Sequence, residues 1–215
     1  PGDLPDIARR IAAAAYAFAG QSCISVQRIL AHEDIYVALR DDLVEAANAV
    51  AHGDPAERSV ICGPLIDEAN ADRVEQWIAD GVAAGGRLLA GGDREASVIS
   101  PTLVEEVPAD QPIVAEELFG PAAVLDPYED FSQALNMVNE SRYGLQAGVF
   151  TSDRNKIPEA WSRREVGGIM VGEVPTWRTD PMPYGGVKGS GVGREGPLYA
   201  YREMTEERLL DLRKG

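Results

Sequence analysis

The sequence predicts an α/β fold of three layers, α/β/α, built around a mainly parallel sheet. Short apolar or β-branched runs alternate with longer segments in which apolar residues recur at helical spacing. Such alternation is typical of a parallel sheet that helices cover on both faces. A chain of 215 residues is long enough for one large domain with its own core, and no repeat or low-complexity linker divides it. We therefore treat residues 1–215 as one domain.

Helices are expected where the helical spacing lies between residues that begin and end helices. Asp3 can cap the first helix, Pro5 suits its first turn and Gly20 can end it. The expected helices cover 4–19, 34–51, 68–84, 131–139 and 153–164. Strands are expected in the short runs between them, at 24–30, 87–90, 98–107, 122–126, 147–151, 168–171 and 209–212. The segment 172–193 is rich in Gly and Pro, and a loop of about 20 residues inside a compact domain tends to be functional.

Composition argues against several classes of partner. The net charge of −15 disfavours nucleic acid and anionic membranes, because phosphate binding needs clustered Lys and Arg. No run of about 18 apolar residues is present to span a membrane, and the apolar stretch 11–19 lacks the flanks of a signal peptide. Two cysteines form no disulfide framework, and His32 and His52 stand apart from other metal ligands. We expect a cytoplasmic protein without a metal site.

The first candidate site is the segment Gly-Gln-Ser-Cys-Ile-Ser at 20–25, which places the thiol of Cys23 at a turn between a helix and a strand. Backbone N–H groups at such a junction can stabilise an oxyanion, and a cysteine there can form a covalent thiohemiacetal with an aldehyde. A lone cysteine is, however, more often an inert buried residue. We assign that structural role to Cys62, which lies in an apolar run before a Gly-Pro pair.

The second candidate site is the segment Glu-Glu-Leu-Phe-Gly-Pro at 116–121, directly before an expected strand. A carboxylate can accept hydrogen bonds from both hydroxyls of a ribose, and an aromatic ring can pack against a nicotinamide. The alternative is a solvated acidic turn that precedes a strand. These residues by themselves leave both interpretations open.

The third candidate site is the glycine-rich segment 182–196, whose glycines permit close backbone approach. It lacks the spacing of a Walker phosphate loop. It also does not follow a strand that opens a βαβ unit, so it does not match a Rossmann fingerprint.

In order and spacing, these three segments resemble the aldehyde dehydrogenase superfamily. The resemblance covers essentially the whole chain. The intervening stretches that agree with it lie at 63–66, 91–92, 101–103, 139–145 and 149–151.

The resemblance implies the catalytic-domain fold of that family and the oxidation of a small aldehyde with NAD or NADP. Cys23 would attack the carbonyl as a thiolate, hydride would pass to the nicotinamide, and water would hydrolyse the resulting thioester. Glu117 matches the family glutamate that holds the nicotinamide ribose, and Phe119 matches the aromatic beside it. Glu195 matches a glutamate in a Gly-Arg-Glu motif that some members use in a proton path. A homo-oligomer of the full-length protein is also implied, with 209–213 as a strand of its interface.

Several parts of the family pattern do not appear in the sequence. The general base of the family is a glutamate in a Glu-Leu-Gly-Gly motif ahead of the cysteine, and no such motif precedes Cys23. The asparagine that completes the oxyanion hole and the Rossmann-like cofactor domain would also precede it. The segment 1–5 resembles the start of the catalytic domain, so we expect a chain cut close to a domain boundary.

The stretch 16–28, together with Pro-Thr-Trp-Arg at 175–178, looks closest to the lactaldehyde and phosphonoacetaldehyde dehydrogenase branch. Phe18 stands where many members carry an asparagine. The loop that lines the aldehyde tunnel in the family contains the positions of Trp177, Arg178 and Tyr184. Our hypothesis is that Arg178 pairs with an anionic group on the aldehyde. The alternative is an exposed surface arginine.

Two other classes of function are possible for such a chain. A non-catalytic relative would serve as a scaffold, but Cys23, Glu117 and the Gly-Arg-Glu stretch are all retained. A Cys-His hydrolase would need an imidazole near the cysteine. His32 lies beyond the strand that follows Cys23, and His52 ends a helix, so neither is convincingly placed.

We predict that the 215-residue chain alone has no dehydrogenase activity. Loss of a general base typically costs about 10²–10⁴-fold in rate, and loss of the cofactor domain removes the hydride acceptor. The measurement is absorbance at the nicotinamide band after the isolated chain is mixed with NAD and an aldehyde. Reduction of NAD by the isolated chain would contradict the prediction.

Overall fold

A computed structural model describes residues 2–215; Pro1, where the predicted domain begins, lies outside the described residues. The main sheet contains four strands in the order β1-β6-β5-β2. The central pairs β1–β6 and β6–β5 are parallel, and β2 joins β5 antiparallel at one edge. The bounds are Arg28–His32 for β1, Ala122–Tyr128 for β6, Thr102–Glu105 for β5 and Arg87–Ala90 for β2. The predicted mainly parallel sheet is therefore confirmed.

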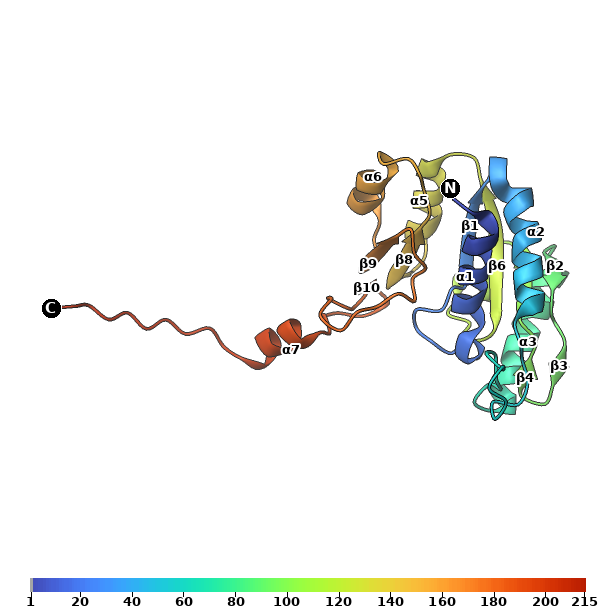
Figure 1. The fold of residues 1–215 in the computed structure, drawn as a ribbon, viewed down its shortest axis with the longest axis horizontal. Helices are drawn as coiled ribbons and strands as arrows, with labels where there is room; N and C mark the ends of the chain where they lie inside the picture. The colour runs from blue at the N-terminus through green and yellow to red at the C-terminus, as the bar shows by residue number, and fades with distance from the viewer. Residues whose placement is uncertain (1) are drawn as a thin grey trace.

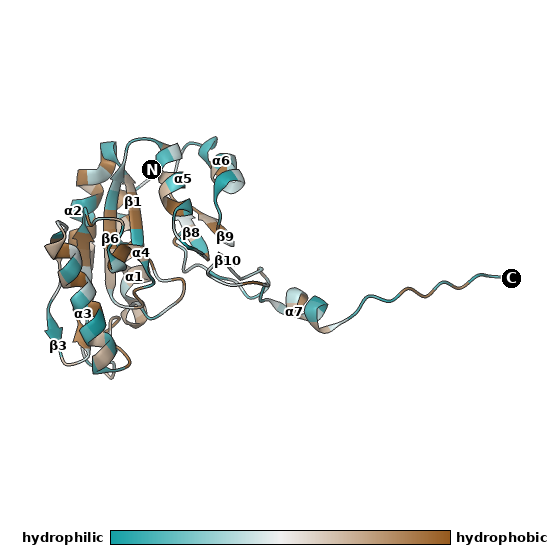
Figure 2. Cartoon of the chain, turned by 180° about the vertical axis from the view of Figure 1, so that it is seen from behind, coloured by the Kyte–Doolittle hydropathy of each residue, from teal (hydrophilic) through white to brown (hydrophobic). Residues whose placement is uncertain are grey.

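Helices cover both faces of the main sheet. Figure 1 shows α1 (Leu4–Tyr16) and α2 (Glu33–Ala49) in front of it, and Figure 2, from behind, shows α3 (Glu68–Ala83) in front of the other face. The short helix α4 (Pro112–Ala115) packs with α3. Tyr16 is fully buried, and its hydroxyl donates to the carbonyl of Thr102 over 3.1 Å, which ties α1 to β5. The three-layer arrangement is confirmed.

Local capping explains where several helices begin. Asp3 accepts a hydrogen bond from the N–H of Asp6 at the start of α1, and Asp67 accepts one from Asn70 at the start of α3. Each cap satisfies a backbone donor that the first turn leaves free. The same aspartate cap begins α5 at Asp130.

A smaller group of elements lies beside β1 in Figure 1. It contains α5 (Phe131–Asn139), α6 (Lys156–Arg163) and a parallel pair of strands, β8 (Gln146–Val149) with β9 (Gly168–Val171). Two further antiparallel pairs complete the strands of residues 2–215. They are β10 (Val187–Lys188) with β7 (Tyr143–Gly144), and β3 (Arg94–Glu95) with β4 (Val98–Ile99).

The strand predicted at 24–30 begins only at Arg28. Of the preceding residues, Ser25 and Val26 bond to the end of α1, whereas the carbonyl of Gln27 already accepts from Val124 in β6. The hydroxyl of Ser25 lies 3.2 Å from the carbonyl oxygen of Ala14 and 3.0 Å from that of Ala15, and the N–H of Val26 also donates to Ala14. The segment that carries the cysteine is therefore a turn fixed to the helix, and not the first part of the strand.

Near the C-terminus the structure differs from the prediction in two ways. A helix, α7 (Pro197–Met204), follows the glycine-rich segment, where none was expected. No strand forms at 209–212; this segment lies in an extended tail that points away from the body in Figure 1, and Leu209 is 95% exposed. A strand requires a neighbour to pair with its backbone groups, and the tail contacts none. Its assignment to an oligomer interface stays a prediction.

Gly20 ends the turn after α1 in a way that requires glycine. Its φ of +66° lies in the left-handed region, and a Cβ atom there would collide with the carbonyl oxygen of Gly120. The turn before the cysteine and the turn before β6 are thus in direct backbone contact. Because backbone atoms are involved, no side-chain rearrangement could relieve the collision.

We predict that Gly20→Ala lowers the free energy of unfolding by about 1–3 kcal/mol more than a matched control. The control is Gly172→Ala, because Gly172 has a similar φ of +71° but a Cβ atom added there would meet nothing within 4 Å. The measurement is chemical denaturation of the two variants. Equal destabilisation would show that only the left-handed backbone matters, and would contradict the proposed collision.

Candidate active site

The thiol of Cys23 lies in the turn between the 3-10 helix η1 (Ala17–Gly20) and β1, and it is exposed. Cys62 is in contrast fully buried, and burial raises the pKa of its thiol to about 12. A thiol with so high a pKa stays protonated near neutral pH and is a poor nucleophile. Of the two cysteines, Cys23 is the exposed one, and its role as the nucleophile stays a prediction.

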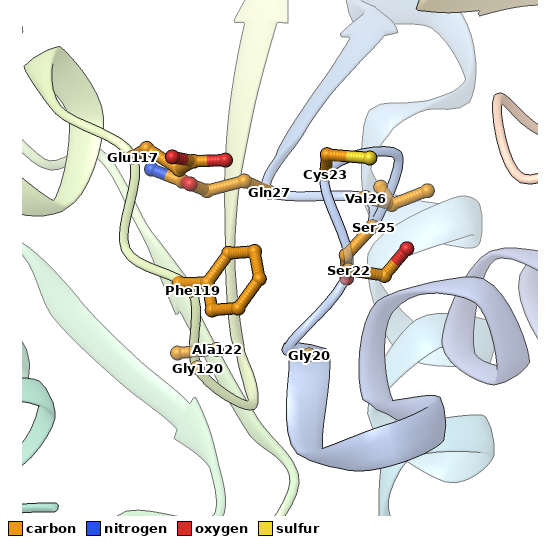
Figure 3. A pocket seen from close by; sticks show the side chains of 10 residues that line it. All are labelled: Gly20, Ser22, Cys23, Ser25, Val26, Gln27, Glu117, Phe119, Gly120 and Ala122. Atoms are coloured by element: carbon orange, nitrogen blue, oxygen red, sulfur yellow. The ribbon is translucent and has the colours of Figure 1, made fainter. Parts of the chain in front are cut away.

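The second predicted segment faces the cysteine across a small hollow of ≈ 50 Å³. Figure 3 shows Glu117 opposite Cys23, with its carboxylate directed toward the cysteine turn, and Phe119 below both. Phe119 is 41% exposed, and its φ of +51° lies in the left-handed region. The hollow is lined by Gly20, Ser22, Cys23, Ser25, Val26, Gln27, Glu117, Phe119, Gly120 and Ala122. The structure thus brings together an exposed thiol, a carboxylate and an aromatic ring.

Two glutamines fix the segment that carries the cysteine, and neither was assigned a role from the sequence; of the two, Gln27 lines the hollow. Gln21 accepts from the N–H of Ile66 over 2.9 Å and donates to the carbonyls of Phe18 and Pro64. Gln27 bonds to the segment around Glu117. Most of these partners lie far along the chain, so nothing in the local sequence indicates the contacts.

The glycine-rich segment brings Tyr184 to the cysteine. Its hydroxyl lies 2.7 Å from the Sγ atom of Cys23. The ring is almost fully buried, and burial, followed by the hydrogen bond to Cys23, raises the pKa of Tyr184 well above its ordinary value. The hydroxyl therefore keeps its proton near neutral pH and can donate it in a hydrogen bond to a thiolate.

Arg178 and Glu195 form the surroundings of Tyr184. Tyr184 and Glu195 exchange two backbone hydrogen bonds, of 3.1 and 2.6 Å. The guanidinium of Arg178 lies 4.1 Å from the centre of the Tyr184 ring and 3.3 Å from the carboxylate of Glu195. Four residues that were predicted from separate motifs therefore form one continuous group that begins at the sulfur of Cys23.

Phe18 and Trp177, which were predicted to bind substrate, do not line the hollow. Phe18 is 80% exposed, and its backbone is in the left-handed region with its N–H bonded to the carbonyl of Ile61. That backbone conformation directs the ring to solvent. Trp177 is about half exposed. Their contact with a substrate stays a prediction.

Two further observations concern metals and membranes. Within residues 2–215, no three His, Cys, Asp or Glu side chains are grouped so that they could hold a metal ion. None of the helices in the same part of the chain is both long and apolar enough to cross a bilayer.

Comparison with known proteins identifies the family. The model of the aldehyde dehydrogenase family matches residues 2–210. The 3-sulfolactaldehyde dehydrogenase of Priestia aryabhattai is 41% identical over 210 residues, which cover 98% of this chain and 44% of that protein.

Solved structures show the same fold. Aldehyde dehydrogenase 21 of Physcomitrella patens, in complex with the reaction product succinate, superposes with a TM-score of 0.91 at 40% identity, covering 94% of this chain and 42% of that one. The glyceraldehyde-3-phosphate dehydrogenase GapN of Methanocaldococcus jannaschii, complexed with NADP, superposes with a TM-score of 0.90 at 34% identity. The match covers 94% of this chain and 44% of that one. The chain thus spans less than half the length of the proteins it matches.

We predict that Tyr184→Phe slows alkylation of Cys23 about 2- to 10-fold at neutral pH, since the hydroxyl that can donate a hydrogen bond to the thiolate is lost. The ring and its contact with Arg178 are retained in this variant. The measurement is the rate of iodoacetamide labelling of the Cys23 peptide by mass spectrometry. Tyr128→Phe is the control, because that ring contacts His32 and is remote from the thiol. An unchanged rate in Tyr184→Phe would contradict the role of the hydroxyl.

Proposed function

The chain belongs to the aldehyde dehydrogenase family, and from this premise we propose that it supplies the nucleophile and part of the nicotinamide site for oxidation of a small anionic aldehyde with NAD or NADP. One observation carries the proposal. The exposed thiol of Cys23 faces Glu117 and Phe119 across one hollow and has a hydroxyl donor at its sulfur. A scaffold protein has no need of this arrangement.

The residues present suit the nicotinamide end of the cofactor. The side chain of Glu117 offers two acceptor oxygens for a ribose diol, and Phe119 presents a ring to the same hollow. The cofactor supplies a hydride acceptor when it is bound. Because the hollow is small, Glu117 and Phe119 would contact only the nicotinamide end, and we propose that other residues hold the rest of the cofactor.

In the proposed reaction the Cys23 thiolate adds to the aldehyde carbon, and the carbonyl electron pair moves to oxygen. The thiohemiacetal carbon then loses hydrogen with its electron pair, and the carbonyl re-forms as a thioester on Cys23. Water adds to the thioester and releases one proton to solvent, and the carboxylic acid leaves as the sulfur takes back the electron pair of the C–S bond. The aldehyde is oxidised by two electrons, and Cys23 is regenerated.

Tyr184 and Glu195 contribute differently to these steps. The Tyr184 hydroxyl donates to the sulfur, which stabilises negative charge on the nucleophile before attack and on the leaving thiolate. The carboxylate of Glu195 is 68% exposed and bonded to Arg178. The main chain of Glu195 exchanges hydrogen bonds with that of Tyr184, and we propose that its exposed carboxylate exchanges protons with solvent.

Arg178 is proposed to bind the anionic group of the substrate. Its guanidinium is partly exposed and covers the ring whose hydroxyl touches the nucleophile. A planar guanidinium recognises sulfonate and carboxylate groups through paired hydrogen bonds. The relatives support the same substrate class, since one is named for 3-sulfolactaldehyde and another was solved with succinate.

The proposed nucleophile is tested with the full-length enzyme. We expect Cys23→Ala to abolish aldehyde-dependent reduction of NAD or NADP, because no covalent intermediate can form. Cys62→Ala is the matched control and should retain activity, since this thiol is buried and bonds only to the carbonyl of Ile99. Activity that survives in Cys23→Ala, or wild-type protein that oxidises no aldehyde, would refute the proposed function.

For the anionic substrate we predict that Arg178→Ala lowers kcat/KM about 10- to 100-fold on a sulfonated or carboxylated aldehyde, the size expected for a charge-assisted hydrogen bond. Propanal, which has no charge, should be oxidised at nearly the wild-type rate. Arg9→Ala is the control for a general charge effect, because Arg9 lies on the exposed side of α1. Equal losses on both aldehydes would assign Arg178 a purely structural role.

A further inference from the structure

Gln27 has no direct contact with the reacting thiol, yet its side chain holds the segment that carries Glu117. We propose that Gln27 is a positioning residue that fixes the Glu117 carboxylate relative to Cys23. This inference rests on the proposed function, because it assigns Gln27 to the binding of the nicotinamide ribose. Figure 3 shows the Gln27 side chain reaching from the cysteine turn toward Glu117.

Three hydrogen bonds carry the inference. The Nε2 atom of Gln27 donates to the carbonyl of Glu116 over 2.6 Å and to that of Ile113 over 2.9 Å. Its Oε1 atom accepts from the N–H of Leu118 over 2.9 Å. The peptide groups before and after Glu117 are thus both bonded to a single side chain. Because both donors and the acceptor of the amide are used, its orientation is fixed.

The main chain of Gln27 is anchored as firmly as its side chain. Its carbonyl accepts from the N–H of Val124 in β6 over 2.8 Å. Cys23 and Gln27 belong to the same short segment, whose beginning is bonded to α1 and whose end enters β1. Gln27 therefore links the cysteine turn directly to the turn that carries Glu117 and fixes the two turns relative to each other.

The side chain of Glu116 is held separately by Arg142 and Tyr143. The turn that carries Glu117 is therefore fixed by a second set of contacts besides those of Gln27. A group that binds two ribose hydroxyls must be held within about 0.5 Å of its productive position. Loss of the Gln27 hydrogen bonds would free the peptide groups before and after Glu117. The Glu117 carboxylate itself would be chemically unchanged.

The test uses Gln27→Met in the full-length enzyme, because Met has a similar length but no amide. We expect the KM for NAD or NADP to rise at least tenfold, while the alkylation rate of Cys23 stays within twofold of wild type. Gln76→Met is the matched control; Gln76 is exposed on α3 and bonds only to Asp80. An unchanged cofactor KM, or equal effects from the two variants, would overturn the inference.

A double-mutant cycle separates positioning from a general structural role. If Gln27 acts through Glu117, then Gln27→Met combined with Glu117→Gln should be no worse for cofactor KM than Glu117→Gln alone. Losses that multiply would overturn the inference. If Gln27→Met does not fold, Gln27→Glu keeps the acceptor for Leu118 and loses both donors, and the same cycle applies to it.

Amide hydrogen exchange distinguishes a failure of this inference from a failure of the proposed function. In Gln27→Met the N–H of Leu118 should exchange at least tenfold faster, whereas that of Val124, which bonds to the Gln27 backbone, should be unchanged. Unaltered exchange at Leu118 would overturn the role of Gln27 even in an active enzyme. Wild-type protein that oxidises no aldehyde would overturn the proposed function, whatever the exchange shows.

Discussion

The backbone contact between Gly20 and Gly120 brings the two parts of the candidate site together. Gly20 ends the turn that precedes the cysteine, and Gly120 lies in the turn that precedes β6. The two backbones are so close that a Cβ atom at position 20 would collide with the carbonyl oxygen of Gly120. Any larger residue at position 20 would push the turns apart. The separation between the thiol of Cys23 and the carboxylate of Glu117 therefore depends on a position with no side chain.

The main sheet also fixes the cysteine turn and the Glu117 turn relative to each other. β1 leaves the cysteine turn and β6 leaves the Glu117 turn, and the two strands pair in parallel from Arg28 opposite Val124 onward. Strands that are far apart in the chain are thus held in register by backbone hydrogen bonds. Since parallel neighbours begin at the same edge of a sheet, both functional turns lie at that edge.

The other wall of the site is built from a segment with little regular structure. The backbone pair between Tyr184 and Glu195 closes the glycine-rich segment into a loop, and the Tyr184 hydroxyl at the cysteine sulfur is the point where this loop meets the cysteine turn. Arg178 adds an electrostatic link, because it lies over the tyrosine ring and beside the Glu195 carboxylate. The thiol of Cys23, the hydroxyl of Tyr184, and the charged groups of Arg178 and Glu195 thereby form one continuous group.

What the sequence by itself determined is local or depends on the order of its motifs: the alternation of helices and strands, the cap of the first helix at Asp3, and the family of the chain. These follow from periodicity and from short segments whose chemistry is evident without a fold. Only the tertiary structure decided that the cysteine segment bonds to α1 before it becomes a strand, that Tyr184 reaches the sulfur, and that Gln27 holds the turn around Glu117. Those contacts join residues far apart in the chain. They form only when the fold brings the two residues within hydrogen-bonding distance, and the local sequence does not show which residues will meet. The tail at 209–212 shows the same limit, because an apolar run becomes a strand only when another strand is beside it.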